Sequence, residues 1–224
     1  MSLIAKQKES ARIPPLDGGT YMFVCVGVID LGEQRDDAYK DCNDKVRLIF
    51  EIPSETLEIN GEQKPRWLSK KYTKTFGRKS YLRKDIEAWL GCQFTDEEAK
   101  SGFELIQMLG KAGQISVIVE DSKDGTKQYN KITSIIGIPK GMPTPETSSE
   151  LLTYDIDAHD DTVWEKIPEW IRDEITKSTQ WKRNVEPKPL DFKEKAEATG
   201  TETVTATTTT ATTPTPTTAK KAPF

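Results

Sequence analysis

Apolar and β-branched residues form three runs of strand length in the first third of the chain. One run is almost continuously apolar, as expected of a buried strand. The next alternates apolar and polar residues, which predicts a single buried face, and it ends before Pro53. The pair Asn60-Gly61 then indicates a hairpin turn leading into a third strand. The predicted strands are 21–29 (YMFVCVGVI), 45–52 (KVRLIFEI) and 65–76 (PRWLSKKYTKTF).

Helical spacing replaces this alternation after the third strand. Ser80 can cap a first helix that stops at Gly91. Thr95 begins a second helical segment, 95–109, and Gly102 weakens the middle of this segment. Two more strands are predicted at 114–120 and 128–138. Three strands, a helical insert and two strands is the order of an OB-fold, a five-stranded Greek-key barrel. We therefore expect a mainly β fold of this kind, although another small barrel or an α+β sandwich would give a similar pattern.

Composition divides the chain into four parts. Hydrophobic residues make up 35% of the 224 residues, against roughly 45–50% in typical domains, so part of the chain is not expected to pack. In 199–218, thirteen of twenty residues are Thr, and such a segment cannot offset its ordering entropy by burial. The predicted parts are a flexible lead-in (1–15), the OB-like domain (16–142), a linker plus amphipathic helix (143–183) and a disordered tail (184–224).

Basic residues are concentrated around the third strand, although the net charge of the chain is -4. Nine of them lie between Lys64 and Lys84, a stretch without Asp or Glu. Proteins that bind single strands combine a positive groove with aromatic rings that stack bases, and strands 2 and 3 are the usual binding face of an OB-fold. The candidate nucleic-acid-binding residues are Arg47, Arg66, Trp67, Lys70, Lys71, Tyr72, Lys74, Phe76, Arg78 and Lys79.

Alternation along the third strand separates two faces but does not indicate which one is exposed. Leu68, Lys70 and Tyr72 share one face, and Trp67 and Lys71 share the other. The competing interpretation of the lysines is a solvated strand protected from edge-to-edge aggregation.

An amphipathic helix is predicted within 163–181, because apolar residues recur there at helical spacing and Pro168 suits a first turn. Its apolar stripe either docks on the barrel of this chain or recognises a protein partner. The candidate partner-binding residues are Trp164, Trp170, Ile171 and the terminal Phe224.

The residue pattern gives little support to an enzymatic function. The acidic loop predicted over 30–44 could hold a metal ion in a nuclease, but its spacing does not match an EF-hand and the chain has one His. We predict no catalytic residue, metal or cofactor. The sequence shows neither a secretory signal pattern nor a membrane-spanning run, and three scattered cysteines suit a reducing compartment, which predicts a cytoplasmic protein without membrane contact.

Several stretches carry a resemblance to a known family: 16–32 (LDGGTYMFVCVGVIDLG), 79–99 (KSYLRKDIEAWLGCQFTDEEA), 104–120 (ELIQMLGKAGQISVIVE), 132–142 (ITSIIGIPKGM) and 163–178 (VWEKIPEWIRDEITKS). They resemble phage-encoded single-stranded-DNA-binding or replication-module proteins. The resemblance covers about 14–183 and implies an OB-fold that binds single-stranded DNA. The end of the chain, Pro223-Phe224, is similar to that of bacterial single-stranded-DNA-binding proteins, although Lys220 and Lys221 stand where those proteins carry acids.

These observations together predict a non-enzymatic, non-sequence-specific binder of single-stranded DNA that acts in phage DNA replication or recombination, in the host-cell cytoplasm. Replication or recombination proteins are the expected protein partners, and self-association is left open. The main alternative is an adaptor of the phage replication machinery that binds protein without strong DNA binding. A weaker alternative is a metal-dependent nuclease.

Overall fold

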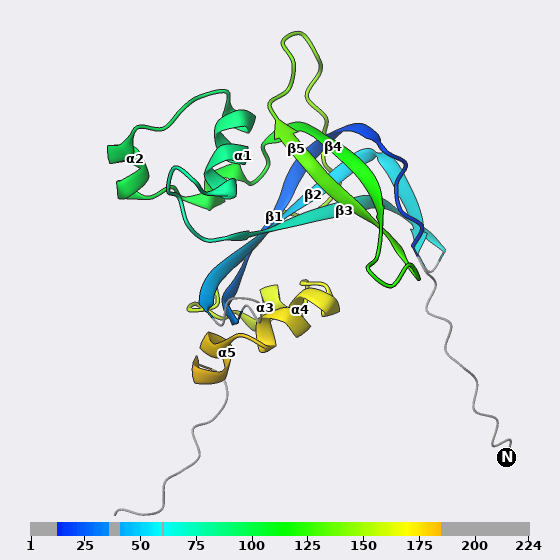
Figure 1. Ribbon diagram of the computed structural model, residues 1–224. Helices are drawn as coiled ribbons and strands as arrows, with labels where there is room; N and C mark the ends of the chain where they lie inside the picture. Colours follow the sequence, from blue (N-terminus) through cyan, green and yellow to red (C-terminus); the bar gives the residue numbers. More distant parts are fainter. Residues whose placement is uncertain (1–12, 36–40, 60, 185–224) are drawn as a thin grey trace, which may run out of the picture. The chain divides into compact units, whose positions relative to one another are not determined.

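The computed structural model describes residues 13–35, 41–59 and 61–184, and its central feature is a six-stranded sheet (Figure 1). Its strand path is β3-β2-β1-β4-β5, with antiparallel neighbours, and β6 pairs with β1 in parallel. β3 and β5, at the two ends of the path, approach one another. The mainly β class and the helical insert between β3 and β4 are confirmed. The strands are β1 (Gly19–Arg35), β2 (Cys42–Ile59), β3 (Glu62–Thr73), β4 (Ala112–Asp121), β5 (Gln128–Ile136) and β6 (Leu152–Tyr154).

β1 and β2 are longer than the sequence pattern indicates. The predicted loop over 30–44 is mostly strand, because the β1–β2 ladder continues to the pair Arg35 and Cys42. β2 also continues past Pro53, where the sequence predicts an end. The β2–β3 register shifts between Ile52 and Thr56, so the proline falls in an irregular stretch of the strand. A proline without an N–H is tolerated at such a position.

The sheet is covered on both faces, which explains why the first predicted run is continuously apolar. One face of β1 contributes Phe23 to a core that includes Trp89 of α1 (Tyr81–Leu90). The other face contributes Val24 and Ile29 to a second core, which the C-terminal segment completes. A strand buried on both faces has no polar side to alternate with.

The helical insert begins and ends where its capping residues predict. The Ser80 hydroxyl accepts the N–H of Arg83 at the start of α1, and Gly91 ends this helix in the left-handed conformation. Thr95 forms a capping box with Glu98 at the start of α2 (Asp96–Ser101). The single helix predicted over 95–109 is wrong, because Gly102, at φ 90°, separates α2 from the 3₁₀ helix η1 (Leu105–Met108).

The C-terminal segment belongs to the same compact unit as the sheet, so residue 142 is not a boundary between folded units. β6 pairs with Gly27–Ile29 of β1, and the side chains of Ile167, Ile171 and Ile175 are buried against the second core. Among the described residues no helix is long and apolar enough to cross a membrane. The helices here are α3 (Asp161–Trp164), α4 (Glu169–Thr176) and α5 (Thr179–Asn184), so the amphipathic helix predicted within 163–181 is divided into short helices. The predicted tail lies outside the described residues except for Asn184, as does most of the lead-in.

Candidate nucleic-acid interface

β3 directs its predicted binding residues to two opposite faces, and one of these faces is the core. Tyr72 is 4% exposed, and its hydroxyl donates a hydrogen bond of 2.7 Å to Asp85. Burial, reinforced by Asp85, raises the pKa of the Tyr72 phenol far above its usual value. The expectation that Tyr72 stacks a base is therefore wrong, because its ring has no open face. Phe76 is half-buried and packs against Phe94 and Phe103.

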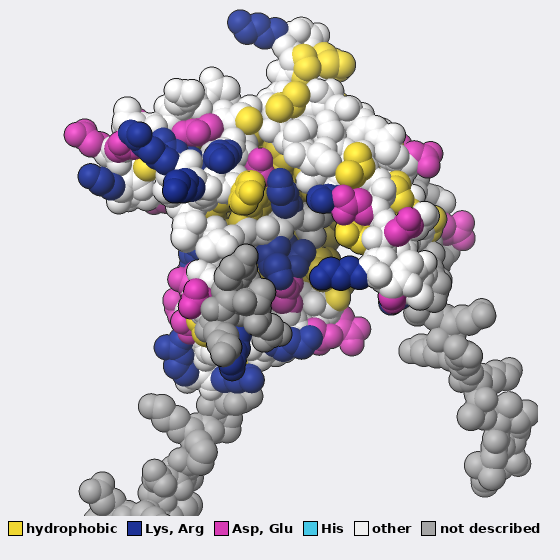
Figure 2. All heavy atoms as spheres, in the orientation of Figure 1, with side chains coloured by type: hydrophobic (Ala, Val, Ile, Leu, Met, Phe, Trp, Pro, Cys, Tyr) yellow, Lys and Arg dark blue, Asp and Glu magenta, His cyan; other side chains and the backbone are white. Residues whose placement is uncertain are grey.

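Acids from other elements pair with Arg47 and with four of the nine basic residues between Lys64 and Lys84, a stretch that the sequence presents as uncompensated. Asp30, Asp85, Asp96 and Glu174 supply these carboxylates from β1, α1, α2 and α4. A phosphate must compete with each pair, so the positive potential is lower than the local sequence predicts. The pairs are Lys70–Asp85 (2.6 Å), Lys74–Asp30 (2.6 Å), Lys71–Glu174 (2.7 Å), Arg47–Glu174 and Arg78–Asp96. Figure 2 shows acidic side chains among the basic ones.

Arg66 is buried rather than exposed. Its side chain lies in the buried part of the strand, and the guanidinium donates a hydrogen bond to the carbonyl oxygen of Pro14. Burial lowers the pKa of Arg66, against the opposing effect of Glu55. This arginine therefore fixes the start of the described chain on β3, and its predicted role as a phosphate contact is wrong.

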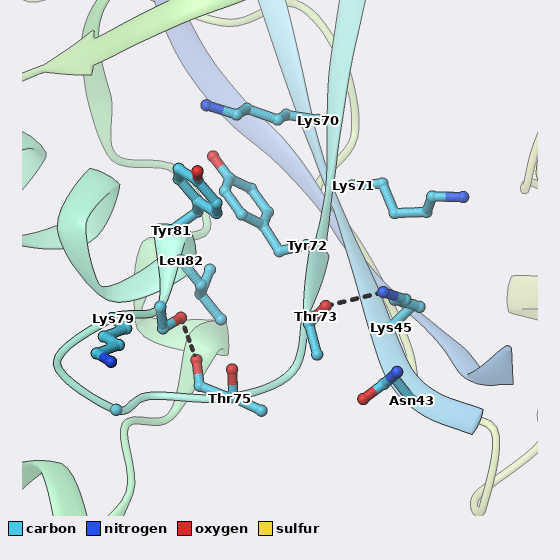
Figure 3. A pocket seen from close by; sticks show the side chains of 12 residues that line it. Asn43, Lys45, Lys70, Lys71, Tyr72, Thr73, Thr75, Lys79, Tyr81 and Leu82 are labelled. Carbon is cyan, nitrogen blue, oxygen red and sulfur yellow. Dashed lines mark hydrogen bonds between the residues drawn. The ribbon is translucent and has the colours of Figure 1, made fainter. Parts of the chain in front are cut away.

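A groove of about 670 Å³ lies between β3, the start of β2 and the loop before α1 (Figure 3). No Asp or Glu lines it, and we call it the lysine groove after Lys45, Lys70, Lys71 and Lys79. Lys70 and Lys71 leave β3 in opposite directions. Lys45 donates a hydrogen bond of 2.8 Å to Thr73, and within the described residues neither Lys45 nor Lys79 forms an ion pair. These two ammonium groups are accordingly the ones most available to phosphate.

Tyr81 supplies the aromatic ring of this groove, and the sequence analysis missed it. Its side chain is 77% exposed and lines the groove at the first residue of α1. The apolar stripe of α1, which includes Leu82 and Ile86, turns toward the core and leaves Tyr81 on the outer side. The sequence did contain a sign of this exposure: Tyr81 lies off the apolar stripe of its helix, directly after the cap residue Ser80.

A second, apolar groove of about 410 Å³ lies between β3 and α4, and we call it the tryptophan groove after Trp67 and Trp170. Trp67 is 37% exposed and Trp170 is 53% exposed. The indole N–H of Trp67 donates to the Ser149 hydroxyl at 3.1 Å. The guanidinium of Arg47 lies 4.7 Å from the centre of the Trp170 ring, so both indoles have defined partners.

The partner-binding residues predicted in the C-terminal helix do not lie on one surface. Ile171 is 0% exposed, so its predicted partner contact is wrong. Trp164 is partly buried and stacks on Trp181 at 4.5 Å between ring centres, which also removes it from a free surface. Trp170 alone of the described candidates is exposed, and Phe224 lies outside the described residues.

The acidic region considered for metal binding does not form a cluster of carboxylates in the part that the structure describes. Asp30 pairs with Lys74 and accepts the N–H of Gly32, and the residues from 36 to 40 lie outside the described part. The described residues contain no group of three His, Cys, Asp or Glu side chains that could hold a metal ion. Comparison with protein-family models and with curated proteins finds no match to this chain.

Proposed function

We propose that this protein binds single-stranded DNA without sequence specificity, through the lysine groove of an OB-like barrel. The observation that carries the proposal is the combination of Lys45, Lys79 and the exposed Tyr81 around one groove without acids. A positive groove beside an aromatic ring supplies the two contacts that single strands need, one to phosphate and one to a base. Neither contact depends on base identity.

The arrangement of the strands supports the OB-like part of the proposal. β1 is central, the path ends at β3 and β5, and the helical insert connects β3 to β4. The lysine groove lies on β2 and β3, the strands that carry oligonucleotide binding in OB-folds. The resemblance to phage-encoded single-strand binders extends the proposal to a role in phage DNA replication or recombination.

In this mechanism Lys45 and Lys79 contact phosphates directly, and the base of a neighbouring nucleotide stacks on Tyr81. Lys70 and Lys71 also line the groove, but each must exchange its carboxylate partner for phosphate. That exchange replaces one ion pair by another and contributes less than a contact made by an unpaired lysine. We therefore expect two to four effective phosphate contacts.

The proposal predicts salt-sensitive binding of a labelled oligo-dT. With two to four contacts, log K should fall with log salt at a slope of about -1.4 to -2.8, from roughly -0.7 per contact on single strands. Lys45→Glu and Lys79→Glu should each weaken binding of oligo-dT and of mixed-sequence strands equally, because phosphate contacts are the same in both. Fluorescence anisotropy measured between about 50 and 300 mM salt gives both the salt slope and the loss of affinity in each variant.

Lys140→Glu is the matched control, because Lys140 is an exposed lysine outside the lysine groove and the substitution makes the same change in net charge. It should weaken binding less than either groove variant. Absence of binding at low salt, or equal losses for Lys79→Glu and Lys140→Glu, contradicts the proposed function.

A further inference from the structure

The tryptophan groove has the features of a binding site, and the mechanism above does not use it. Its wall combines two exposed indoles with apolar side chains such as Leu57. The charged side chains that line it are Lys64, which pairs with Glu62 at 3.2 Å, and the buried Arg66; no acid lines it. An apolar slot with a basic wall suits a ligand that joins a flat ring to negative charge.

The two indoles are positioned before any ligand arrives. The Trp67 N–H is held by Ser149, and one face of Trp170 rests on Arg47. Arg47 is itself fixed, since its guanidinium donates to the Ser69 hydroxyl at 3.0 Å and pairs with Glu174. A ligand that stacks on these rings loses little free energy to ordering them. The stacked guanidinium also makes Trp170 part of a planar cation–π pair.

The tryptophan groove and the lysine groove are lined by consecutive residues of β3. Lys70 and Lys71 of β3 line the lysine groove, and Leu68 and Ser69, which precede them directly, line the tryptophan groove. A strand advances about 3.3 Å per residue, so Lys71 and Trp67 are separated by about 13 Å of strand. A single DNA strand that runs along β3 from the lysine groove to the two indoles passes Lys71, where its phosphate replaces the carboxylate of Glu174.

We propose that the tryptophan groove is a second nucleotide subsite, in which a base of the same DNA strand stacks on Trp170 and contacts Trp67. This inference rests on the proposed function and deepens it, because it assigns an aromatic side chain of the C-terminal helix α4 to the DNA rather than to a protein. Charge favours the nucleotide over an uncharged apolar peptide, because Lys64 is half-exposed at the edge of the groove and can contact a phosphate. Arg66 is held by Pro14 and adds positive potential without touching the phosphate. The C-terminal segment thereby both completes the core and extends the binding surface.

The test compares three substitutions of Trp170 in the full chain, with oligo-dT as the probe. Trp170→Ala and Trp170→Leu should both weaken binding by about 5- to 150-fold, which corresponds to the loss of one base–aromatic stack. Trp170→Phe, which keeps an aromatic face, should bind within about 3-fold of the unchanged protein. The Leu variant separates stacking from burial, because Leu keeps an apolar wall without a π-face.

Two controls make the outcome specific. Ile106→Ala removes an apolar side chain with the same 53% exposure from outside this groove and should leave affinity unchanged. Thermal melting should show only a small shift of the midpoint for the Trp170 variants, because this side chain is 53% exposed and its contact with Arg47 lies at the surface. Unchanged affinity of Trp170→Ala alongside a clear loss for Lys79→Glu overturns the subsite and leaves the proposed function standing.

If Trp170→Leu binds like the unchanged protein and only Trp170→Ala is weak, the groove takes an apolar group and the nucleobase assignment is wrong. If the unchanged protein does not bind oligo-dT at all, the proposed function fails first, and the subsite fails with it. Retention by Trp170→Phe together with loss by both Ala and Leu supports the subsite.

Discussion

Tyr72 and Tyr81 both border the lysine groove, yet their rings have opposite environments. Tyr72 is held in the core by its hydrogen bond to Asp85, whereas Tyr81 projects from the first turn of α1 into solvent. A buried ring contributes to stability by removing apolar area from water, and an exposed ring can contribute to binding by stacking. Tyr72 is therefore expected to contribute to stability and Tyr81 to DNA binding, although both border the same groove.

Substituting each tyrosine by alanine should produce opposite results. Tyr81→Ala should weaken oligo-dT binding by about 1–3 kcal/mol and leave the free energy of unfolding nearly unchanged. Tyr72→Ala should lower the free energy of unfolding by about 3–5 kcal/mol, the usual cost of removing a buried aromatic ring. Anisotropy and urea denaturation measure the two effects. Loss of stability in Tyr81→Ala without a specific loss of affinity would contradict the role assigned to its ring.

At the level of elements, α4 determines how much positive charge β2 and β3 present. Glu174 of α4 pairs with Arg47 and with Lys71, which lie on neighbouring strands. Burial alone would raise the pKa of this carboxyl, but the pairs with Lys71 and Arg47 outweigh it and hold the pKa below its ordinary value of 4.5. One helix therefore both docks on the sheet and neutralises two of the predicted DNA contacts.

The lowered pKa of Glu174 predicts a pH dependence of stability. A carboxyl with a depressed folded-state pKa adds stability above its unfolded-state value, near 4.5, and loses it as pH falls through the folded-state pKa. Glu174→Gln should thus reduce the free energy of unfolding at pH 7 by about 1–3 kcal/mol, and the difference from the unchanged protein should shrink below pH 4.5. Urea midpoints measured from neutral to acidic pH test this.

The same variant also tests how α4 affects DNA binding. Removing the carboxylate charge frees Arg47 and Lys71, so Glu174→Gln should bind oligo-dT more tightly and with a steeper salt slope. Asp173→Asn is the control, since Asp173 is the exposed neighbour on the same helix and changes the net charge equally. An equal gain in affinity for both variants would point to net charge alone rather than to these pairs.

At the scale of the whole molecule, the C-terminal segment is required to cover the second face of the sheet. Ile167, Ile171 and Ile175 are each at most 1% exposed, and they pack with Val26 and Ile49 of the sheet. Burial of one such side chain contributes about 1.5–3 kcal/mol. Three of them together approach the 5–15 kcal/mol that separates a typical folded domain from its unfolded chain.

Two truncations should therefore behave differently. A chain ending after residue 142 should unfold or aggregate, because it exposes the apolar second face of β1. A chain ending after Asn184 keeps every described helix and should melt at the midpoint of the full chain and bind oligo-dT within a few-fold. The segment that it lacks, with its Thr-rich composition, cannot build a core. A stable, cooperatively melting 1–142 chain would contradict this account of the second core.

The sequence predicted the local features of this fold well. Ser80, Gly91 and Thr95 cap helices where expected, since capping depends on residues within one turn. The predicted core of every long strand is present. The errors lie at strand ends, in the helix that Gly102 divides and in the helix predicted within 163–181, which is divided into short helices. β6 was missed because a strand of three residues has too short a pattern to detect and is stabilised by its pairing with β1.

The candidate site was predicted only in part, because its properties depend on contacts between distant residues. The sequence located the basic stretch and the aromatic residues of β3, and it could not show that Tyr72 and Arg66 are buried. The pairs of Glu174 join residues separated by 103 and 127 positions, beyond the reach of any local pattern. Tyr81 was missed for the converse reason, since exposure follows from what the rest of its helix packs against.

The amino-acid sequence by itself determined the class of the fold, the order of its elements and the concentration of positive charge around β3, because periodicity, capping and composition act over a few residues. The tertiary structure decided which face of β3 is open, which lysines keep a free charge and whether the C-terminal helix packs on its own chain. Those outcomes depend on which distant surfaces meet, since a side chain is buried or paired only when another part of the chain reaches it. The same meeting of α4 with β3 brings Trp170 and Trp67 to one groove.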